Sequence, residues 1–279
     1  MTEYRSSPQI VHAGHRRVPR GSESPWFHAF PPAPDLSGEI VCTWSAVSRG
    51  HHLLVPDGCT DLLWLDDGTT VLCGPETRAW EFRLPPGVTA HGCRLMPGLA
   101  PSLLGLDAVA ITNRRVPLED IVGSRRAREL GERVGEATDR RAEIETRVRH
   151  LIGTGPLHSS DDHGLVEALL TVSGPAPVDQ VARRTGLRPR DLHRHAVAMF
   201  GYGPKTLLRL IRFQRFLHPP RPPGQRVPGA GHLAARAAYA GYYDQAHLAR
   251  DCRRITGLTP SELLARHTPA FPARTDPYL

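Results

Sequence analysis

The C-terminal part of the chain contains the same sequence pattern twice. Gly-x-x-Pro occurs at Gly201–Pro204 and again at Gly257–Pro260, each time between a short arginine-bearing segment and an amphipathic one. The glycines Gly186 and Gly241 precede the two prolines by 18 and 19 residues, so the copies are nearly in register. A helix, a tight turn with glycine and a second helix with a polar face form a helix-turn-helix unit, whose second helix enters the DNA major groove. The repeat therefore predicts two such units.

The second helix of each unit has one apolar and one polar face. The apolar residues are Leu192, Ala196, Met199 and Phe200 in the first unit and Leu248, Cys252 and Ile255 in the second. On the polar faces we expect contacts with base edges from Arg190, His193, Arg194, Gln245, His247 and Arg250. Arginine can bind guanine through two hydrogen bonds, and glutamine can pair with adenine. Phosphate contacts, which position without reading sequence, are expected from Arg209, Arg212, Arg253 and Arg254.

Residues with strong end preferences bound these helices. Pro189 suits the first position of one helix, where a missing N–H costs nothing, and Asp244 suits the N-cap of the other. Thr259 and Glu262 have the spacing of a capping box, which predicts that a further helix begins there.

A connecting helix is predicted after Pro204. It should stop near His218, because five prolines follow between positions 219 and 228 and proline breaks helices. We expect this proline run to lengthen the tether of the second unit and to loosen the spacing of the two recognition helices.

The charge of the chain is unevenly distributed. Residues 1–163 carry 18 basic and 21 acidic side chains, whereas residues 164–279 carry 17 and 7, an excess of ten positive charges. Such an excess attracts polyanions, above all nucleic acid, through phosphate neutralisation and counterion release. Arginines that merely solvate a helix face are the alternative, and the duplicated pattern favours DNA contact.

Three strings carry a resemblance to a known family: VARRTGLRPRDLHRH, GYGPKTLLRLIRFQRFL and AGYYDQAHLARDCRRITGLTPSELL. Over roughly residues 165–266 the chain resembles the DNA-binding domain of the AraC/XylS family of transcriptional regulators. The resemblance implies that Arg190, His193 and Arg194 in the first unit, and Gln245, His247 and Arg250 in the second, occupy the base-contacting positions. The proline run is a departure from the family's short connection between the two units.

The segment from about residue 39 to 95 alternates short apolar runs with turn signals. The runs are EIVCTWSAV, HHLLVPDG, TDLLWLDDG, TTVLCGP, AWEFRLPPG and VTAHGCRL. They predict the strands of an antiparallel sandwich or barrel, and the proline-rich first 38 residues should be irregular or form an edge. PDGCTDLLW and VLCGPETRAW also resemble the cupin-like effector or dimerisation domain of some actinobacterial members of the family. The expected class is α+β, with an N-terminal β-barrel and an all-α C-terminal domain.

Apolar residues recur at helical spacing after residue 123. The stripe they form could pack on the chain's own barrel or on a second copy, and both interpretations stay open. We expect a β-rich regulatory domain at 1–122, a helical dimerisation segment at 123–153, a linker at 154–163, the DNA-binding domain at 164–268 and a tail at 269–279.

An effector pocket is expected in the β-rich domain. Its candidate residues are Trp44, Trp64, Trp80 and Arg78, with Trp26, Asp57 and Asp61 as further candidates. Aromatic residues in a sandwich also serve as core, which is the alternative for all the tryptophans.

A cysteine and a pair of histidines in the β-rich segment suggest two other classes of function. Cys59, after a Pro-Asp-Gly turn, could act in a redox or alkylation sensor or be a small buried residue. His51 and His52 could belong to a cupin-type metal enzyme fused to a DNA-binding module. However, the five cysteines form no C-x-x-C pair, and no G-x-S-x-G, H-E-x-x-H or P-loop sequence occurs. We therefore expect no enzyme, metal or cofactor.

No apolar run reaches the roughly 20 residues needed to cross a bilayer, and the N-terminus lacks the apolar segment of a signal peptide. The expectation is a cytoplasmic homodimer with double-stranded DNA as its main partner and no membrane partner. A small-molecule effector and RNA polymerase are further candidate partners.

Overall fold

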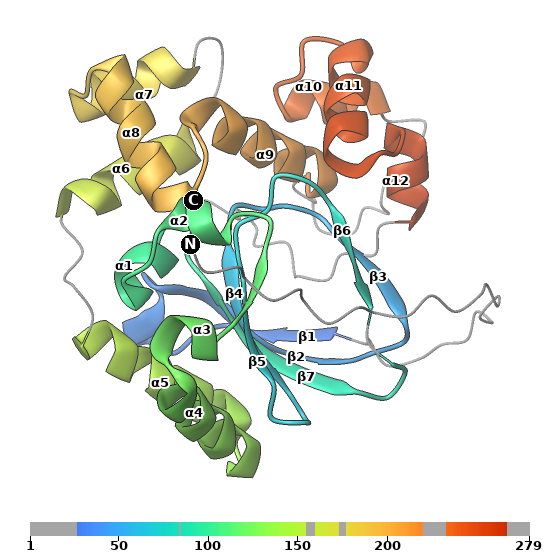
Figure 1. The fold of residues 1–279 in the computed structure, drawn as a ribbon. Helices are drawn as coiled ribbons and strands as arrows, with labels where there is room; N and C mark the ends of the chain where they lie inside the picture. Colours follow the sequence, from blue (N-terminus) through green and yellow to red (C-terminus); the bar gives the residue numbers. More distant parts are fainter. Residues whose placement is uncertain (1–26, 84, 155–159, 173–176, 220–232, 267–279) are drawn as a thin grey trace, which may run out of the picture.

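The computed structural model describes residues 27–83, 85–154, 160–172, 177–219 and 233–266. A β-rich N-terminal part lies beneath a helical C-terminal part (Figure 1), which confirms the predicted α+β class. Among the expected features, Trp26, residues 155–159, the proline-rich residues 220–228 and the tail lie outside the described residues.

All six apolar runs of the N-terminal part form strands, and two further strands flank them. The strands are β1 (Phe27–Phe30), β2 (Ile40–Val47), β3 (His51–Leu54), β4 (Thr60–Leu65), β5 (Thr70–Cys73), β6 (Trp80–Arg83), β7 (Thr89–Leu95) and β8 (Arg115–Pro117). A six-stranded sheet has the order β1-β2-β7-β4-β5-β8, and β3 pairs with β6 in a separate two-stranded sheet. The predicted strand-rich domain is thus present, but its strands do not close into a barrel. The larger sheet has open edges at β1 and β8, and β1 is an edge strand in the segment where an edge was expected.

Side-chain alternation along the strands divides the sheet into two different faces. On β4, Leu62 and Trp64 belong to the main core of the domain, whereas Leu63 belongs to a second cluster with Trp44 on the opposite face. Gly92 on β7 lies beneath the indole of Trp44, and a side chain at this position would overlap that ring. The absence of a Cβ here lets Trp44 lie flat on the sheet.

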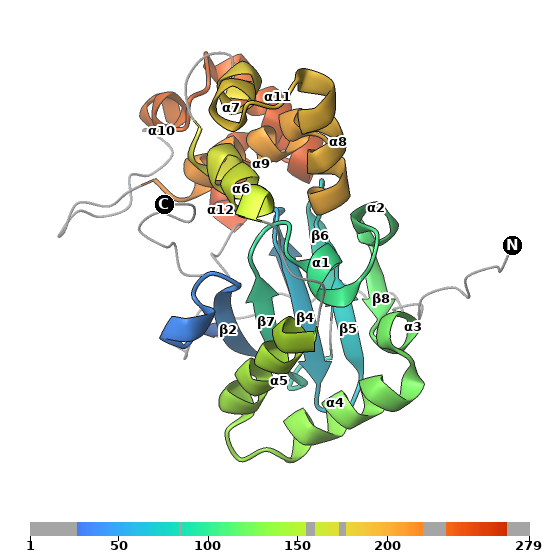
Figure 2. The same ribbon diagram turned by 90° about the vertical axis from the view of Figure 1, so that its left-hand side faces the viewer.

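Helices cover the core face of the large sheet (Figure 2). They are α1 (Ala100–Leu104), α2 (Ala108–Ile111), α3 (Glu119–Val122), α4 (Ser124–Glu136) and α5 (Arg140–Thr154). Leu130 and Val134 of α4 and Ile144 and Val148 of α5 are buried in the same cluster as Leu62 of the sheet. The apolar stripe of α4 and α5 thus packs on the chain's own sheet, and it gives no support for a dimer seam.

The helical part begins with α6 (Ser160–Thr171), which includes residues 160–163 of the predicted linker. The remaining helices are α7 (Pro177–Thr185), α8 (Pro189–Phe200), α9 (Pro204–Leu217), α10 (Leu233–Tyr239), α11 (Gln245–Thr256) and α12 (Pro260–Arg266). Figure 1 shows α9 between the α7–α8 pair and the α10–α11 pair. Two helix-turn-helix units joined by a connecting helix are therefore present, and α9 ends at Leu217, next to the predicted His218.

The predicted helix ends are confirmed. Pro189 occupies the first turn of α8, and Gly201 and Gly257 end α8 and α11 in the left-handed conformation, at φ 75° and 74°. Thr259 and Glu262 form the capping box, with the Thr259 amide donating to Glu262 Oε2 at 2.8 Å. No helix in the described part of the chain is long and apolar enough to span a membrane.

Candidate nucleic-acid interface and ligand cavity

The first recognition helix, α8, keeps its polar face open. Leu192, Ala196 and Phe200 are buried against the rest of the domain, while Arg190, His193 and Arg194 are exposed. Arg194 forms an ion pair of 3.1 Å with Asp191 one turn earlier, and its side chain remains 72% exposed. An ion pair whose arginine stays in solvent contributes little to stability, so Arg194 can exchange Asp191 for a base or a phosphate at small cost. The readout candidates of α8 thus share one accessible surface.

The second recognition helix, α11, has a similar face with one difference. Asp244 caps the helix by accepting a hydrogen bond from the His247 amide at 2.6 Å, and Gln245 and Arg250 are exposed. In contrast, the His247 ring packs edge-on against Tyr242 at 5.1 Å and lies 3.9 Å from Asp251. His247 is thus half-buried against its own domain, whereas the other readout candidates are exposed.

Tyr243 is an addition to the expected set. It precedes the N-cap of α11, and its side chain is 93% exposed. A large ring left in solvent at the start of a recognition helix is suited to stacking or to a phosphate hydrogen bond. The sequence places Tyr243 on the polar side of the helix. Only the structure shows that Tyr243 is exposed while the neighbouring Tyr242 is buried.

The four phosphate candidates fall into two groups. Arg253 and Arg254 are exposed in the last turn of α11. Arg209 and Arg212, on α9, instead face the buried Asp251 of α11 at 3.5 and 3.4 Å. These two arginines therefore connect α9 to the second recognition helix, with 27% of each side chain still exposed.

A second connection fastens the second unit to α9. Arg236 of α10 is buried and donates hydrogen bonds to the carbonyls of Phe216 and Leu217 at 3.2 and 3.0 Å. These carbonyls lie in the last turn of α9, where backbone oxygens lack helical partners and a cation is favourable. Together with Asp251, Arg236 attaches the second unit directly to the connecting helix, independently of the proline-rich segment.

The N-terminal domain contacts both recognition helices at their C-terminal ends. At α8, the ring of Phe200 packs against Gly98, and Gly201 packs against Ala108 of α2. At α11, the amide of Ala79 donates a hydrogen bond to the carbonyl of Ile255 at 2.7 Å. These contacts leave the N-terminal halves of both helices, with their readout candidates, exposed.

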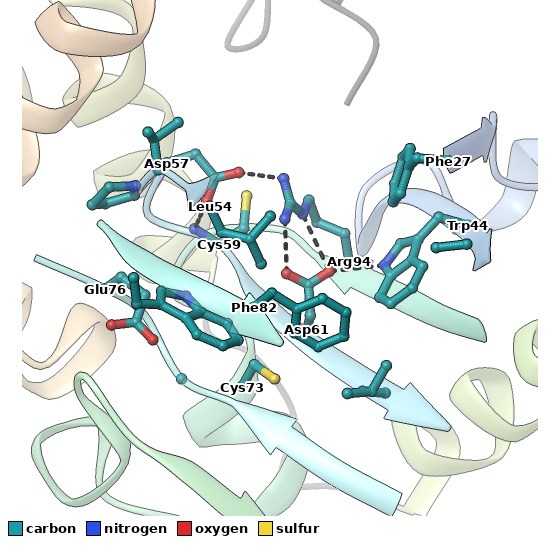
Figure 3. Close-up of a pocket in the computed structure, with 16 residues that line it drawn as sticks. Phe27, Trp44, Leu54, Asp57, Cys59, Asp61, Cys73, Glu76, Phe82 and Arg94 are labelled. Carbon is teal, nitrogen blue, oxygen red and sulfur yellow. Dashed lines mark hydrogen bonds and ion pairs between the residues drawn. The ribbon is translucent and has the colours of Figure 1, made fainter. Parts of the chain in front are cut away.

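A cavity of about 70 Å³ lies in the N-terminal domain, on the face of the large sheet that carries Trp44. Its lining residues include Phe27, Trp44, Trp80, Phe82, Asp57, Asp61, Glu76, Cys59, Cys73 and Arg94. Figure 3 shows Arg94 between Asp57 and Asp61. Arg94 binds both carboxylates, with its Nη2 2.9 Å from Asp61 Oδ2, and the Trp44 indole donates to Asp61 Oδ1 at 3.0 Å.

The structure brings together only some of the residues that were expected to bind an effector. Trp44 and Trp80 line this cavity, as do Asp57 and Asp61. Trp64 lies on the other face of β4 in the main core, because alternate residues of a strand point to opposite faces. Arg78 is exposed and does not line the cavity. The arginine at the cavity is Arg94, which the sequence offers only as a charge within the apolar strand TAHGCRL.

Burial sets the protonation of the cavity groups. It raises the pKa of Asp61, although Arg94 lowers it, and it raises the pKa of Glu76 to about 7 despite the neighbouring Arg115. Burial likewise raises the pKa of Cys59 well above its usual value and that of Cys73 to about 12. Thiols with raised pKa values are poor nucleophiles at neutral pH, which argues against the sensor interpretation for these two cysteines. Within the described ranges, no cluster of three or more His, Cys, Asp or Glu side chains could hold a metal ion.

Two segments of the chain match known domain families. Residues 181–266 match the family model of a helix-turn-helix domain, and residues 28–117 match that of a domain of unknown function, DUF6597. Two solved structures of ToxT are distant likenesses. ToxT from Vibrio cholerae O395 is 10% identical over 88% of this chain and 99% of that chain, with a TM-score of 0.42.

A variant of apo ToxT from Vibrio cholerae strain SCE256 is 9% identical over 81% of this chain and 98% of that chain, with a TM-score of 0.44. No curated protein matches the chain significantly. The helix-turn-helix match covers both α8 and α11, the helices whose polar faces are open. The chain therefore contains a helix-turn-helix domain over residues 181–266 and a DUF6597 domain over residues 28–117.

Proposed function

We propose that this protein is a transcriptional regulator of the AraC type that reads promoter DNA in two successive major grooves. We further propose that a small molecule in the N-terminal cavity changes how it binds this DNA. The observation that carries the first half is the exposure of Arg190 and Arg194 on α8 and of Gln245 and Arg250 on α11. The apolar sides of both helices are used for packing, so the arginine-bearing sides are the ones left for DNA.

The proposed effect of the small molecule rests on segments that line the cavity and also contact the helical domain. Pro56 lines the cavity, and its carbonyl accepts a hydrogen bond of 2.6 Å from the buried Gln214 of α9. Gly58, two residues after Pro56, packs against Leu207 of α9. A ligand that moved this cavity wall would act directly on the connecting helix.

A second lining segment, strand β6 beside β3, has a similar connection to α11. Trp80 lines the cavity, and the preceding residue, Ala79, holds the Ile255 carbonyl at the end of the second recognition helix. A ligand can shift the DNA-binding equilibrium only through such differential contacts between two states. The cavity therefore lies where occupancy could alter the placement of both α9 and α11.

The direct test of DNA reading is fluorescence anisotropy on duplexes selected from a random pool. Arg194→Ala and Arg250→Ala should each cost about 1–3 kcal/mol on the selected duplex and relax its preference over scrambled DNA. Arg125→Ala is the matched control, because Arg125 is 92% exposed and α4 lies at the end of the molecule away from α8 and α11 (Figure 1). Equal affinity of all three variants and the wild type for the selected duplex would contradict the proposal.

A further inference from the structure

The cavity combines aromatic walls with ionised side chains. The rings of Phe27 and Trp44 are tilted against each other at 5.5 Å, and Trp80 meets Phe82 edge to face at 5.7 Å. Both ring pairs line the same space of about 70 Å³. A single water needs roughly 10–15 Å³ of such space, so the cavity has room for the head group of a small organic molecule.

Carboxylates outnumber guanidinium groups among the side chains that line the cavity. Asp57, Asp61 and Glu76 face a single lining arginine, Arg94. Glu76 also forms an ion pair of 2.7 Å with Arg115, a residue of β8 outside the lining. When all three carboxyls are ionised, one negative charge is in excess even with both arginines counted. These groups are largely buried, and electrostatic interactions are stronger there than in water.

The aromatic rings also favour a positively charged ligand. The face of an aromatic ring is negative and attracts cations, and desolvated sites show the strongest attraction. One ring of this cavity already binds a cation from outside, since the Arg115 guanidinium carbon lies 3.4 Å from the centre of the Trp80 ring. The walls and the acidic groups thus select together against anions.

We propose that the cavity binds a small organic cation, an amine or a quaternary ammonium ion with an apolar body. This assignment rests on the proposed function, in which the cavity takes the effector, and names the chemical class of that effector. The ammonium group lies beside Glu76 and Asp61, and the apolar body packs against Trp44 and Phe82. A neutral ligand would fill the space without balancing the charge, and a carboxylate ligand would add to the excess.

The proposal is tested by isothermal titration calorimetry of the full chain with pairs of ligands of similar shape, each pair consisting of a cation and an uncharged analogue, its neutral twin. The pairs are choline with 3,3-dimethylbutan-1-ol and benzylamine with benzyl alcohol, and benzoate is the anionic probe. We expect at least one cation to bind about tenfold or more tightly than its neutral twin, and benzoate to show no binding. The proposal is overturned if a neutral twin or benzoate binds as tightly as the cations, or if neither cation binds at millimolar concentration.

Variants of residues that line the cavity test whether the cation binds there. Glu76→Gln removes a charge and Phe82→Leu removes a ring, and each should weaken cation binding about tenfold. Glu81→Gln is the matched control and should bind as the wild type does, because Glu81 alternates with Trp80 and Phe82 on β6 and points away from the cavity. If Glu76→Gln fails to fold, Phe82→Leu still decides. Cation binding that both variants leave unchanged would place the cation elsewhere and overturn the assignment.

The same samples separate this inference from the proposed function. DNA affinity is measured with and without each probe. Equal binding of neutral twins together with a changed DNA affinity would overturn the cation class and leave the effector role intact. Cation binding that leaves DNA affinity unchanged would uphold the chemical class and contradict the coupling to DNA.

Discussion

The backbone amide of Ala79 donates a hydrogen bond of 2.7 Å to the carbonyl of Ile255. Ala79 immediately precedes a tryptophan of the ligand cavity, and Ile255 lies in the last turn of the second recognition helix. One backbone hydrogen bond thus joins the proposed sensing site to the proposed DNA-reading element. It also holds α11 at a second point, in addition to its contacts with α9.

Removing this hydrogen bond should loosen the second unit selectively. Ala79→Pro deletes the donor, and loss of one such bond costs about 1 kcal/mol, which is about a fivefold fall in protection of α11 amides from hydrogen exchange. Ala79→Gly keeps the donor and serves as the control. Exchange in α8 should be unchanged in both variants. Equal protection of α11 in the proline and glycine variants would show that the bond does not hold this helix.

Asp251 should be the main electrostatic link between α9 and α11. It is buried and faces both Arg209 and Arg212. Asp251→Ala leaves two partly buried guanidinium groups without this partner, so we expect the free energy of unfolding to fall by about 3 kcal/mol in urea titrations. Asp191→Ala, which removes the carboxylate partner of the exposed Arg188 and Arg194 on α8, should lower it much less, because solvent screens these arginines. Similar losses in the two variants would contradict this assignment.

The protonation of Glu76 should make stability depend on pH. Burial raises its pKa from 4.5 to about 7, with Asp57 adding to the rise and Arg115 opposing it. A carboxyl whose pKa is higher in the folded state stabilises the fold fully below the unfolded pKa, and this contribution is lost as pH rises through the folded value. Stability relative to Glu76→Gln should therefore fall, on the order of 2 kcal/mol, between about pH 4.5 and pH 8. Urea unfolding at several pH values measures this, with Glu81→Gln as control, and parallel pH profiles for wild type and Glu76→Gln would contradict it.

Arg253 should contribute to DNA affinity without contributing to sequence preference. It is exposed at the end of α11, beyond the readout candidates. Arg253→Ala should weaken binding to selected and scrambled duplexes alike, and the slope of log K against log salt should become less negative by roughly 0.9, the value for one phosphate contact. Anisotropy titrations at several salt concentrations provide both quantities. Loss of preference without a change of slope would instead make Arg253 a base-reading residue.

Local signals account for the parts of the fold that could be predicted from the sequence. Pro189, Asp244 and the Thr259–Glu262 box determine helix ends through contacts within a few residues, and the structure has all of them. The strand segments are likewise bounded by turn residues close in sequence. Such features need no knowledge of the rest of the chain.

The remaining features depend on tertiary contacts. Whether Trp64 faces a cavity or the core depends on the register of β4, and whether strands close into a barrel depends on pairing between distant segments. Arg209 and Arg212 look like solvent-exposed phosphate contacts until Asp251, some forty residues later, is brought beside them. The link between Gln214 and Pro56 joins residues separated by 158 positions and has no local signal.

Footprinting of the full chain on a selected operator tests the central claim, that α8 and α11 read two successive major grooves. We expect two protected segments about 10 base pairs apart, with Arg194→Ala relaxing base preference in one segment and Arg250→Ala in the other. A single protected segment, or footprints of both variants that match the wild type, would contradict the account.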